Sequence, residues 1–228
     1  MDIWYNFTKS VIRVYMSLFT DGMQVIGNEN IPSGPKIIIA NHAYASDVFA
    51  LPFIFPDKLH FFVQSEIFTV PIVGRLLALA DQIPVVIGQG REALKAARDW
   101  LATGDSVVIF PEGQLNHAEG LRRAGNGAAI LALQSGAPLL PLGIYVPPEF
   151  IKNIRSHMFN RTTLGGWQMH GMLFVRIGEP CLPQVNAAVD IADRSYRSVR
   201  ELTNRMMEQI NGAMQQAQQL ALSYLPPR

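Results

Sequence analysis

Residues 37–47 read Ile-Ile-Ile-Ala-Asn-His-Ala-Tyr-Ala-Ser-Asp, and this stretch decides the fold of the chain. Three β-branched residues and an alanine predict a short buried strand that ends at the polar pair Asn41-His42. A second apolar run, from Val48 to Phe55, predicts a helix soon after the turn. A strand that leads through a turn into a helix places His42 at the carboxyl edge of a sheet, where open α/β folds build their binding sites.

Asp47 follows His42 by five residues and is expected in the first turn of that helix. From there its carboxylate can fold back toward the imidazole. A carboxylate on one ring nitrogen fixes the tautomer and leaves the other nitrogen free as a base. A histidine and an aspartate also occur at this spacing by chance, so the pair alone leaves a catalytic role open.

A second buried strand is predicted from Val107 to Phe110, and it ends in Pro111-Glu112-Gly113. The His-x-x-x-x-Asp pattern and the Phe-Pro-Glu-Gly segment, in this order and at this separation, resemble the glycerolipid acyltransferase family. The type member of that family acylates lysophosphatidic acid, which is 1-acylglycerol-3-phosphate. The resemblance covers roughly residues 20–180.

The resemblance implies an α/β fold in which helices flank a single mixed, mostly parallel sheet, similar to glycerol-3-phosphate acyltransferase, with an amphipathic helix at the N-terminus. We expect residues 1–22 to form a membrane-surface helix and residues 23–228 to form the acyltransferase domain. A length of 228 residues is suited to one such domain.

The composition indicates contact with a membrane surface and excludes several other classes of protein. Only 16% of the residues are charged and 49% are apolar, whereas about 25% are charged in ordinary soluble domains. A net charge of +1 provides no strong field for nucleic acid. The single cysteine, Cys181, excludes an internal disulfide, and we expect a buried, inert thiol in a reducing compartment. We expect no cleavable signal peptide and no membrane-spanning helix, and therefore peripheral attachment to the cytoplasmic face of a membrane.

Residues 3–20 are predicted to form an amphipathic helix, because apolar side chains recur every three or four residues. The members of this stripe are Trp4, Phe7, Val11, Tyr15 and Leu18, and the basic residues Lys9 and Arg13 lie on another side. An apolar stripe with aromatic rings and a basic flank is typical of a helix that lies on a membrane. The same stripe is also compatible with packing on the core of the domain, and both interpretations stay open.

The remaining elements follow the apolar runs and the glycine and proline breaks. Further strands are expected at 25–26, 60–63, 83–86, 137–146 and 172–178, and helices at 72–80, 91–102, 127–134 and 193–222. Residues 147–170 are expected to form an irregular insert, and His60 is expected on the surface at the start of its strand. His157 and His170 have no partners at metal-ligand spacing, so no metal site is predicted.

The chain departs from the family at two positions where arginines usually hold the acceptor's phosphate. These positions read Val86 and Leu115. An anionic headgroup still needs a cation, and the candidates are Arg91, Arg122 and Arg123, each close to the expected start of a helix. We expect Arg123 to contact the phosphate, with Arg122 or Arg91 assisting.

The resemblance also assigns Asn41, Glu112, Gly113 and Gln114 to substrate binding. Glu112 is expected to bond the glycerol hydroxyls or an arginine. Backbone N–H groups near Gly113 are candidates for stabilising the oxyanion that forms when a thioester carbonyl is attacked.

The activity implied by the resemblance is transfer of a fatty acyl group from acyl-CoA or acyl carrier protein to the hydroxyl of a lysophospholipid, in phospholipid biosynthesis. The acceptor expected first is 1-acylglycerol-3-phosphate. His42 would act as general base and Asp47 would orient it. The thioester is a co-substrate, and no cofactor and no nucleic acid partner are expected. An acyl-enzyme on Ser46 is disfavoured, because no Gly-x-Ser-x-Gly elbow surrounds that residue. Another lipid alcohol as acceptor, a catalytically silent lipid-binding homologue and transfer to water remain as alternatives.

Overall fold

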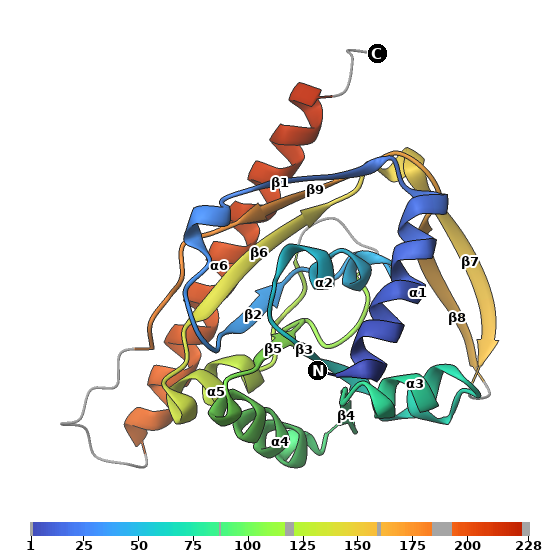
Figure 1. Cartoon of the computed structure of the whole chain (residues 1–228). Helices are drawn as coiled ribbons and strands as arrows, with labels where there is room; N and C mark the ends of the chain where they lie inside the picture. The colour runs from blue at the N-terminus through green and yellow to red at the C-terminus, as the bar shows by residue number, and fades with distance from the viewer. Residues whose placement is uncertain (1, 87, 117–120, 159–160, 184–192, 225–228) are drawn as a thin grey trace.

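A seven-stranded sheet forms the centre of the molecule (Figure 1). The computed structural model describes residues 2–86, 88–116, 121–158, 161–183 and 193–224. The strand order is β1-β9-β6-β2-β5-β3-β4, and every neighbouring pair is parallel except β6 and β9. The predicted mixed, mostly parallel sheet is therefore confirmed. The strands span Gly22–Ile26 (β1), Ile37–Ala40 (β2), Leu59–Gln64 (β3), Ile83–Val85 (β4), Ser106–Ile109 (β5), Leu139–Tyr145 (β6) and Met172–Ile177 (β9).

Helices cover both faces of the sheet, and the side chains of β2 alternate between two cores. Ile37 and Ile39 pack with residues of α4, α5 and α6, whereas Ile38 and Ala40 pack with residues of α2. All four are completely buried, as expected for a central strand covered on both faces. The helices span Ile3–Phe19 (α1), Leu51–Ile54 (α2), Val73–Leu79 (α3), Gly90–Thr103 (α4), Gly127–Ser135 (α5) and Asp193–Tyr224 (α6).

The long C-terminal helix α6 crosses the sheet in direct contact with β6. Gly143 of β6 makes this approach possible, because a Cβ atom at that position would lie 2.1 Å from the main-chain carbon of Ala213. The buried side of α6 includes Met206, Ile210 and Ala217. Helix α6, which is predicted from apolar periodicity alone, thus covers part of one face of the sheet.

The helix expected after residue 47 is shorter and less regular than the sequence predicts. Residues Asp47–Phe49 form a 3-10 turn, and α2 has only four residues. Pro52 lies in the first turn of α2, where proline is tolerated, and Pro56 follows soon after its end. These prolines limit the helix because neither can donate a backbone hydrogen bond in its interior.

The expected irregular insert is instead a β-hairpin, so that part of the prediction is wrong. Strands β7, Ile151–Met158, and β8, Arg161–Gln168, pair with each other in an antiparallel two-stranded sheet outside the main sheet. Gly166 of β8 lies against the turn after β2, because a Cβ atom there would be 2.6 Å from Cδ1 of Tyr44. The glycines read as signs of an irregular loop are therefore sites of close approach within a strand.

His60 is buried and not on the surface as expected. Its ring stacks on Trp100 with centroids 4.2 Å apart, and its nitrogens lie 2.7 Å from the Asp81 carbonyl oxygen and 3.1 Å from Oδ2 of Asp105. Both nitrogens therefore lie within hydrogen-bond distance of a protein oxygen, which is why the imidazole can be fully buried.

Candidate active site

The two sequence motifs meet at the carboxyl ends of adjacent strands. Strands β2 and β5 are parallel and in register, with Ile39 opposite Ile109. The residues that follow them, Asn41-His42 and Phe110-Pro111-Glu112, therefore leave the sheet side by side. The ring of His42 stacks on that of Phe110 at a centroid distance of 4.2 Å and an angle of 22°. This contact restricts the orientation of the imidazole plane.

Asp47 reaches back to His42 from the 3-10 turn. The Nδ1 atom of His42 lies 3.6 Å from Oδ2 of Asp47, and that oxygen accepts a hydrogen bond of 2.8 Å from the Tyr44 N–H. Within the described residues, neither Nδ1 of His42 nor Oδ1 of Asp47 has a hydrogen-bond partner. A distance of 3.6 Å is too long for a formed hydrogen bond, and catalytic hydrogen bonds often tighten only when substrate is bound. The pair is arranged so that Nε2 is left to take a proton.

Tyr44 is a titratable side chain beside the pair. Burial, and then the charge of Asp47, raise the pKa of the Tyr44 phenol above its ordinary value. The phenol therefore stays protonated at neutral pH and cannot replace His42 as the base.

Glu112 is a buried carboxylate that ties three segments together. Its Oε1 accepts from the His42 N–H at 3.1 Å, and its Oε2 accepts from Nδ2 of Asn116 at 2.8 Å and from the Arg122 N–H at 2.9 Å. The Asn116 N–H in turn donates to the His42 carbonyl oxygen at 2.8 Å. The carboxylate therefore fixes the main chain at His42, and a contact with the acceptor stays a prediction that would use its remaining lone pair.

The other expected binding residues have structural contacts of their own. The Asn41 side chain exchanges two hydrogen bonds with the main chain of Ile144, at 2.9 and 2.7 Å, and so extends the pairing of β2 with β6. The Gly113 N–H donates to the Phe110 carbonyl oxygen at 3.0 Å. It is therefore not a free oxyanion donor. Gly113 has a φ angle of 72°, which favours glycine in this turn.

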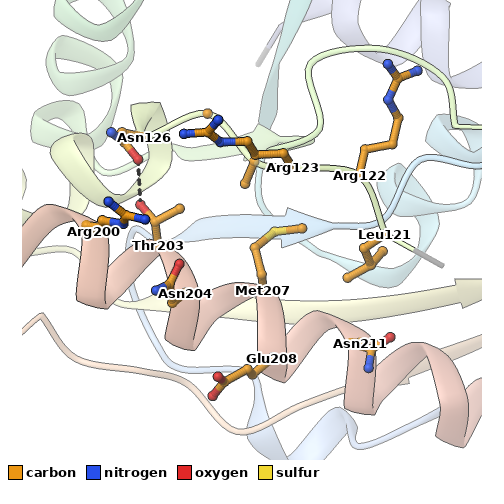
Figure 2. Close-up of a pocket in the computed structure, with 12 residues that line it drawn as sticks. Leu121, Arg122, Arg123, Asn126, Arg200, Thr203, Asn204, Met207, Glu208 and Asn211 are labelled. Atoms are coloured by element: carbon orange, nitrogen blue, oxygen red, sulfur yellow. Dashed lines mark hydrogen bonds between the residues drawn. The ribbon is translucent and has the colours of Figure 1, made fainter.

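The three candidate arginines lie in different places. When the Gln114 amide oxygen is turned toward Arg122, this oxygen accepts hydrogen bonds from Nη2 of Arg122 at 2.8 Å and from Nη1 at 3.2 Å. Figure 2 shows the Arg123 side chain pointing away from that of Arg122, toward Asn126. Arg91 is an exposed residue in the first turn of α4, which follows the edge strand β4. Only Arg122 is bonded to both Glu112 and Gln114, so the geometry favours Arg122 over Arg123 for a contact beside Glu112.

The β7–β8 hairpin and α1 support the turn that carries Asp47. The Ala45 N–H donates to the Gly166 carbonyl oxygen at 2.8 Å, and the Gln168 N–H donates to the buried Oγ of Ser46 at 3.0 Å. The hydroxyl of Tyr15, on α1, donates to the Gln168 carbonyl oxygen at 2.6 Å. Ser46 therefore holds the turn to the hairpin, which agrees with a structural role for this residue.

Several residues of the site have no sequence signal of their own. Phe110 and Asn116 lie within or just after the second motif, but their contacts with His42 depend on the pairing of β2 and β5. The pair Gly165-Gly166 did carry a signal, since adjacent glycines in a strand mark a close backbone approach. Among the described residues, no group of three or more His, Cys, Asp or Glu side chains could hold a metal ion.

Comparison with known proteins defines the family. The family model described as "Acyltransferase" matches residues 22–145, which is more than half of the chain. The chain belongs to this family. Its fold is also that of a solved member. The crystal structure of the 1-acyl-sn-glycerophosphate acyltransferase PlsC from Thermotoga maritima matches with a TM-score of 0.61 over 90% of this chain and 80% of that chain, at 24% identity.

Curated acyltransferases are similar to a part of the chain. A 1-acyl-sn-glycerol-3-phosphate acyltransferase of Pseudomonas aeruginosa is 31% identical over 143 residues, which are 61% of this chain and 54% of that protein. A lyso-ornithine lipid O-acyltransferase of the same organism is 30% identical over 115 residues, which are 50% of this chain and 44% of that protein. The chain thus spans about half the length of these relatives.

Proposed function

We propose that this protein transfers a fatty acyl group from a thioester to the hydroxyl of a lysophospholipid, first of all 1-acylglycerol-3-phosphate, in phospholipid biosynthesis. The observation that carries the proposal is the buried Asp47 carboxylate facing Nδ1 of His42 at the carboxyl ends of β2 and β5. Similarity to a 1-acyl-sn-glycerol-3-phosphate acyltransferase supports this choice of acceptor. The thioester is carried by coenzyme A or by acyl carrier protein.

The proposed reaction is a direct transfer in which His42 is the general base. Nε2 takes the proton of the acceptor hydroxyl while the hydroxyl oxygen attacks the thioester carbonyl carbon. The tetrahedral intermediate then collapses, the carbon–sulfur bond breaks, and the thiolate leaves with the proton from His42. Asp47 stabilises the imidazolium between these steps, and Phe110 and Glu112 hold the ring and its main chain in place.

For the acceptor's phosphate we propose Arg122 as the first contact. Its side chain reaches Gln114 and its N–H reaches Glu112, which in turn bonds the main chain of His42. A guanidinium held beside the catalytic turn provides the cation that Val86 and Leu115 do not supply. Arg122→Ala is expected to raise the KM for the acceptor by roughly ten- to a hundredfold, because a charge-assisted hydrogen bond contributes about 1.5–3 kcal/mol.

A second acceptor class is supported by a specific observation. The two positions at which the family usually has phosphate-binding arginines hold Val86 and Leu115, and one relative is named for a lyso-ornithine lipid, not for a glycerol phosphate. An assay of the purified protein with both acceptors, each offered with acyl-CoA and with acyl carrier protein, separates the two. Preference for the lyso-ornithine lipid, together with an Arg122→Ala variant that behaves as wild type, would contradict the phosphate assignment.

We also propose that α1 attaches the protein peripherally to the cytoplasmic face of a membrane. Among the described residues, no helix is both long and apolar enough to cross a bilayer. One side of α1 packs on the protein through Tyr15, whose ring contacts Phe49 and Trp167. The neighbouring side presents a row of exposed apolar side chains, namely Ile3, Trp4, Phe7, Val11, Val14 and Leu18. Helix α1 is thus suited both to packing on the domain and to contact with a membrane, the two interpretations that its sequence left open.

A further inference from the structure

A groove lies between the loop that follows the second motif and the helix α6 (Figure 2). Residues 121–126 form one wall, and Arg200, Thr203, Asn204, Met207, Glu208 and Asn211 of α6 form the other. Its volume of about 710 Å³ is that of a small-molecule site. Of its described lining residues, only Arg122 has a part in the proposed reaction with His42, through its contact with the acceptor.

The groove carries positive charge at one end. Figure 2 shows the Arg123 and Arg200 side chains at the end where Oγ1 of Thr203 donates to Oδ1 of Asn126, at 3.1 Å. Within the described residues, no carboxylate forms an ion pair with either guanidinium. Glu208 is the only acidic side chain among the groove's described lining residues. Without Arg122, whose guanidinium reaches Gln114, Arg123 and Arg200 against one glutamate still leave a net positive charge.

The N-terminus of α5 adds to the positive potential. Asn126 is the N-cap residue of this nine-residue helix, but its side chain makes no capping hydrogen bond, because its oxygen is used by Thr203. The first N–H groups of α5 therefore have no side-chain acceptor from their cap, and the positive end of the helix dipole lies beside the two guanidinium groups. Together these groups are suited to an anion such as a phosphate.

The groove lies on the face of the sheet that is remote from α1. Helices α4, α5 and α6 pack on the core that contains Ile37 and Ile39, whereas α1 packs over the 3-10 turn and α2 on the other side. When the apolar row of α1 rests on a membrane, the groove is therefore turned to the aqueous phase. In this orientation the groove is open to a water-soluble thioester, while a lipid acceptor comes from the membrane side.

The groove is also connected to the active site by short contacts. The loop that forms its wall is fixed to the second motif by the Arg122 N–H, which donates to Oε2 of Glu112, and by the Gly125 N–H, which donates to the Pro111 carbonyl oxygen at 2.8 Å. The same carboxylate accepts a hydrogen bond from the His42 N–H, so the wall of the groove and the main chain of His42 share a partner. Leu121 and Met207, both part of the wall, provide apolar surface for an uncharged arm.

We propose that this groove binds the carrier portion of the acyl donor, with Arg123 and Arg200 on the phosphate of the phosphopantetheine arm. This inference rests on the proposed acyl transfer, since it assigns the second substrate of that reaction. Coenzyme A and acyl carrier protein both carry this phosphate, so the groove serves either thioester. Arg123 then binds the donor, and Arg122, on the Glu112 side of the loop, binds the acceptor.

The test compares two donors that differ only in that phosphate, an acyl phosphopantetheine and the same acyl pantetheine. The wild type is expected to have a lower KM for the phosphorylated donor. Arg123→Ala and Arg200→Ala should each reduce this preference by roughly five- to thirtyfold, less than the full value of a charge-assisted hydrogen bond because both side chains are exposed. The KM for the acceptor should not change. Arg205→Ala is the matched control, because Arg205 is also exposed on α6 but does not line the groove.

Equilibrium binding of coenzyme A, measured by calorimetry, gives a readout that does not depend on turnover. The same two variants should weaken it and Arg205→Ala should not, even if the acceptor has been misassigned and no transfer is seen. The KM values for acyl-CoA and for acyl carrier protein should rise together in both variants. A rise confined to acyl-CoA, a rise in the acceptor's KM instead, or unchanged binding of coenzyme A by Arg200→Ala would each overturn the assignment.

Discussion

The Nδ1 atom of His42 lies 3.6 Å from Oδ2 of Asp47, and the second oxygen of that buried carboxylate has no hydrogen-bond partner within the described residues. An unpaired oxygen on a carboxylate that is 1% exposed is costly in a folded protein. The arrangement is explained if the pair closes during the reaction, when the imidazole gains a positive charge.

Replacing Asp47 by asparagine tests the orienting role of the carboxylate. We expect kcat to fall by about 10²- to 10⁴-fold, because the neutral amide can favour the wrong imidazole tautomer and cannot stabilise the imidazolium. The KM values of both substrates should change little, since Asp47 contacts neither in the proposed mechanism. Steady-state kinetics checks this, with thermal unfolding as a control for folding. A kcat within threefold of wild type would contradict the role.

Ser46→Ala separates a structural serine from a nucleophile. The variant leaves the buried Gln168 N–H without its acceptor, which should cost about 1–3 kcal/mol of unfolding free energy. For a chain of this size that lowers the Tm by about 2–10 °C. Measurable acyl transfer should remain, because the proposed reaction passes through no acyl-serine. Complete loss of transfer with an unchanged Tm would instead favour a covalent intermediate on Ser46.

The two sides of α1 predict opposite effects of substitution. Trp4→Ser with Phe7→Ser should weaken binding to vesicles that contain anionic phospholipid by about tenfold or more, because each buried aromatic side chain contributes roughly 1.5–3 kcal/mol. Its Tm should stay near that of wild type, since both residues are about half exposed, at 46% and 50%. Tyr15→Phe is the counterpart, because it loses the hydrogen bond to the Gln168 carbonyl and should lower the Tm without affecting vesicle binding. If the double variant loses stability and keeps its vesicle binding, the exposed row is not the membrane contact.

The free energy of unfolding should also depend on pH through Asp2, the N-cap residue of α1. Its hydrogen bond with Lys58, together with that from the Tyr5 N–H, lowers the pKa of the Asp2 carboxyl in the folded protein. A carboxyl with a lowered pKa stabilises the folded state above its ordinary value of about 3.9, and this contribution is lost as the pH falls through the lower folded pKa. Asp2→Asn keeps an N-cap acceptor but removes the charge. Its Tm should be about 1–3 °C below wild type at pH 7, because a partly exposed pair contributes less than about 1 kcal/mol, and the two should converge as the pH falls through the lowered pKa of Asp2. A difference that is constant with pH would contradict this.

The sequence predicts the sheet better than it predicts the site. The buried runs of β2 and β5 are continuous and apolar, and the motifs after them lie where parallel pairing brings them together. The contacts of Glu112 could not be predicted, because two of its donors among the described residues are main-chain N–H groups whose positions depend on the path of two loops. The same holds for Arg122 and Arg123, since exposed neighbours in a loop give no sign of which side each will face.

Two other features were missed for related reasons. The β7–β8 hairpin lacks clear alternation of apolar and polar residues, and its glycine pair resembled a loop, so its role in supporting Ser46 was not visible. The donor groove joins residues as far apart as Asn126 and Thr203, and no periodic pattern in one segment reveals a surface shared with another.

The most direct test of the central claim is the initial rate of acyl transfer to 1-acylglycerol-3-phosphate by the His42→Ala variant, measured with labelled acyl-CoA and acyl carrier protein. His42 is 17% exposed and its side chain makes no hydrogen bond from Nδ1 within the described residues, so the fold should tolerate the change. The account predicts that kcat falls by about 10²- to 10⁴-fold with the more active donor, the range expected for loss of a general base. The Tm should remain close to that of wild type. A folded His42→Ala protein that turns over within a few-fold of wild type would contradict the assignment of His42 as the base.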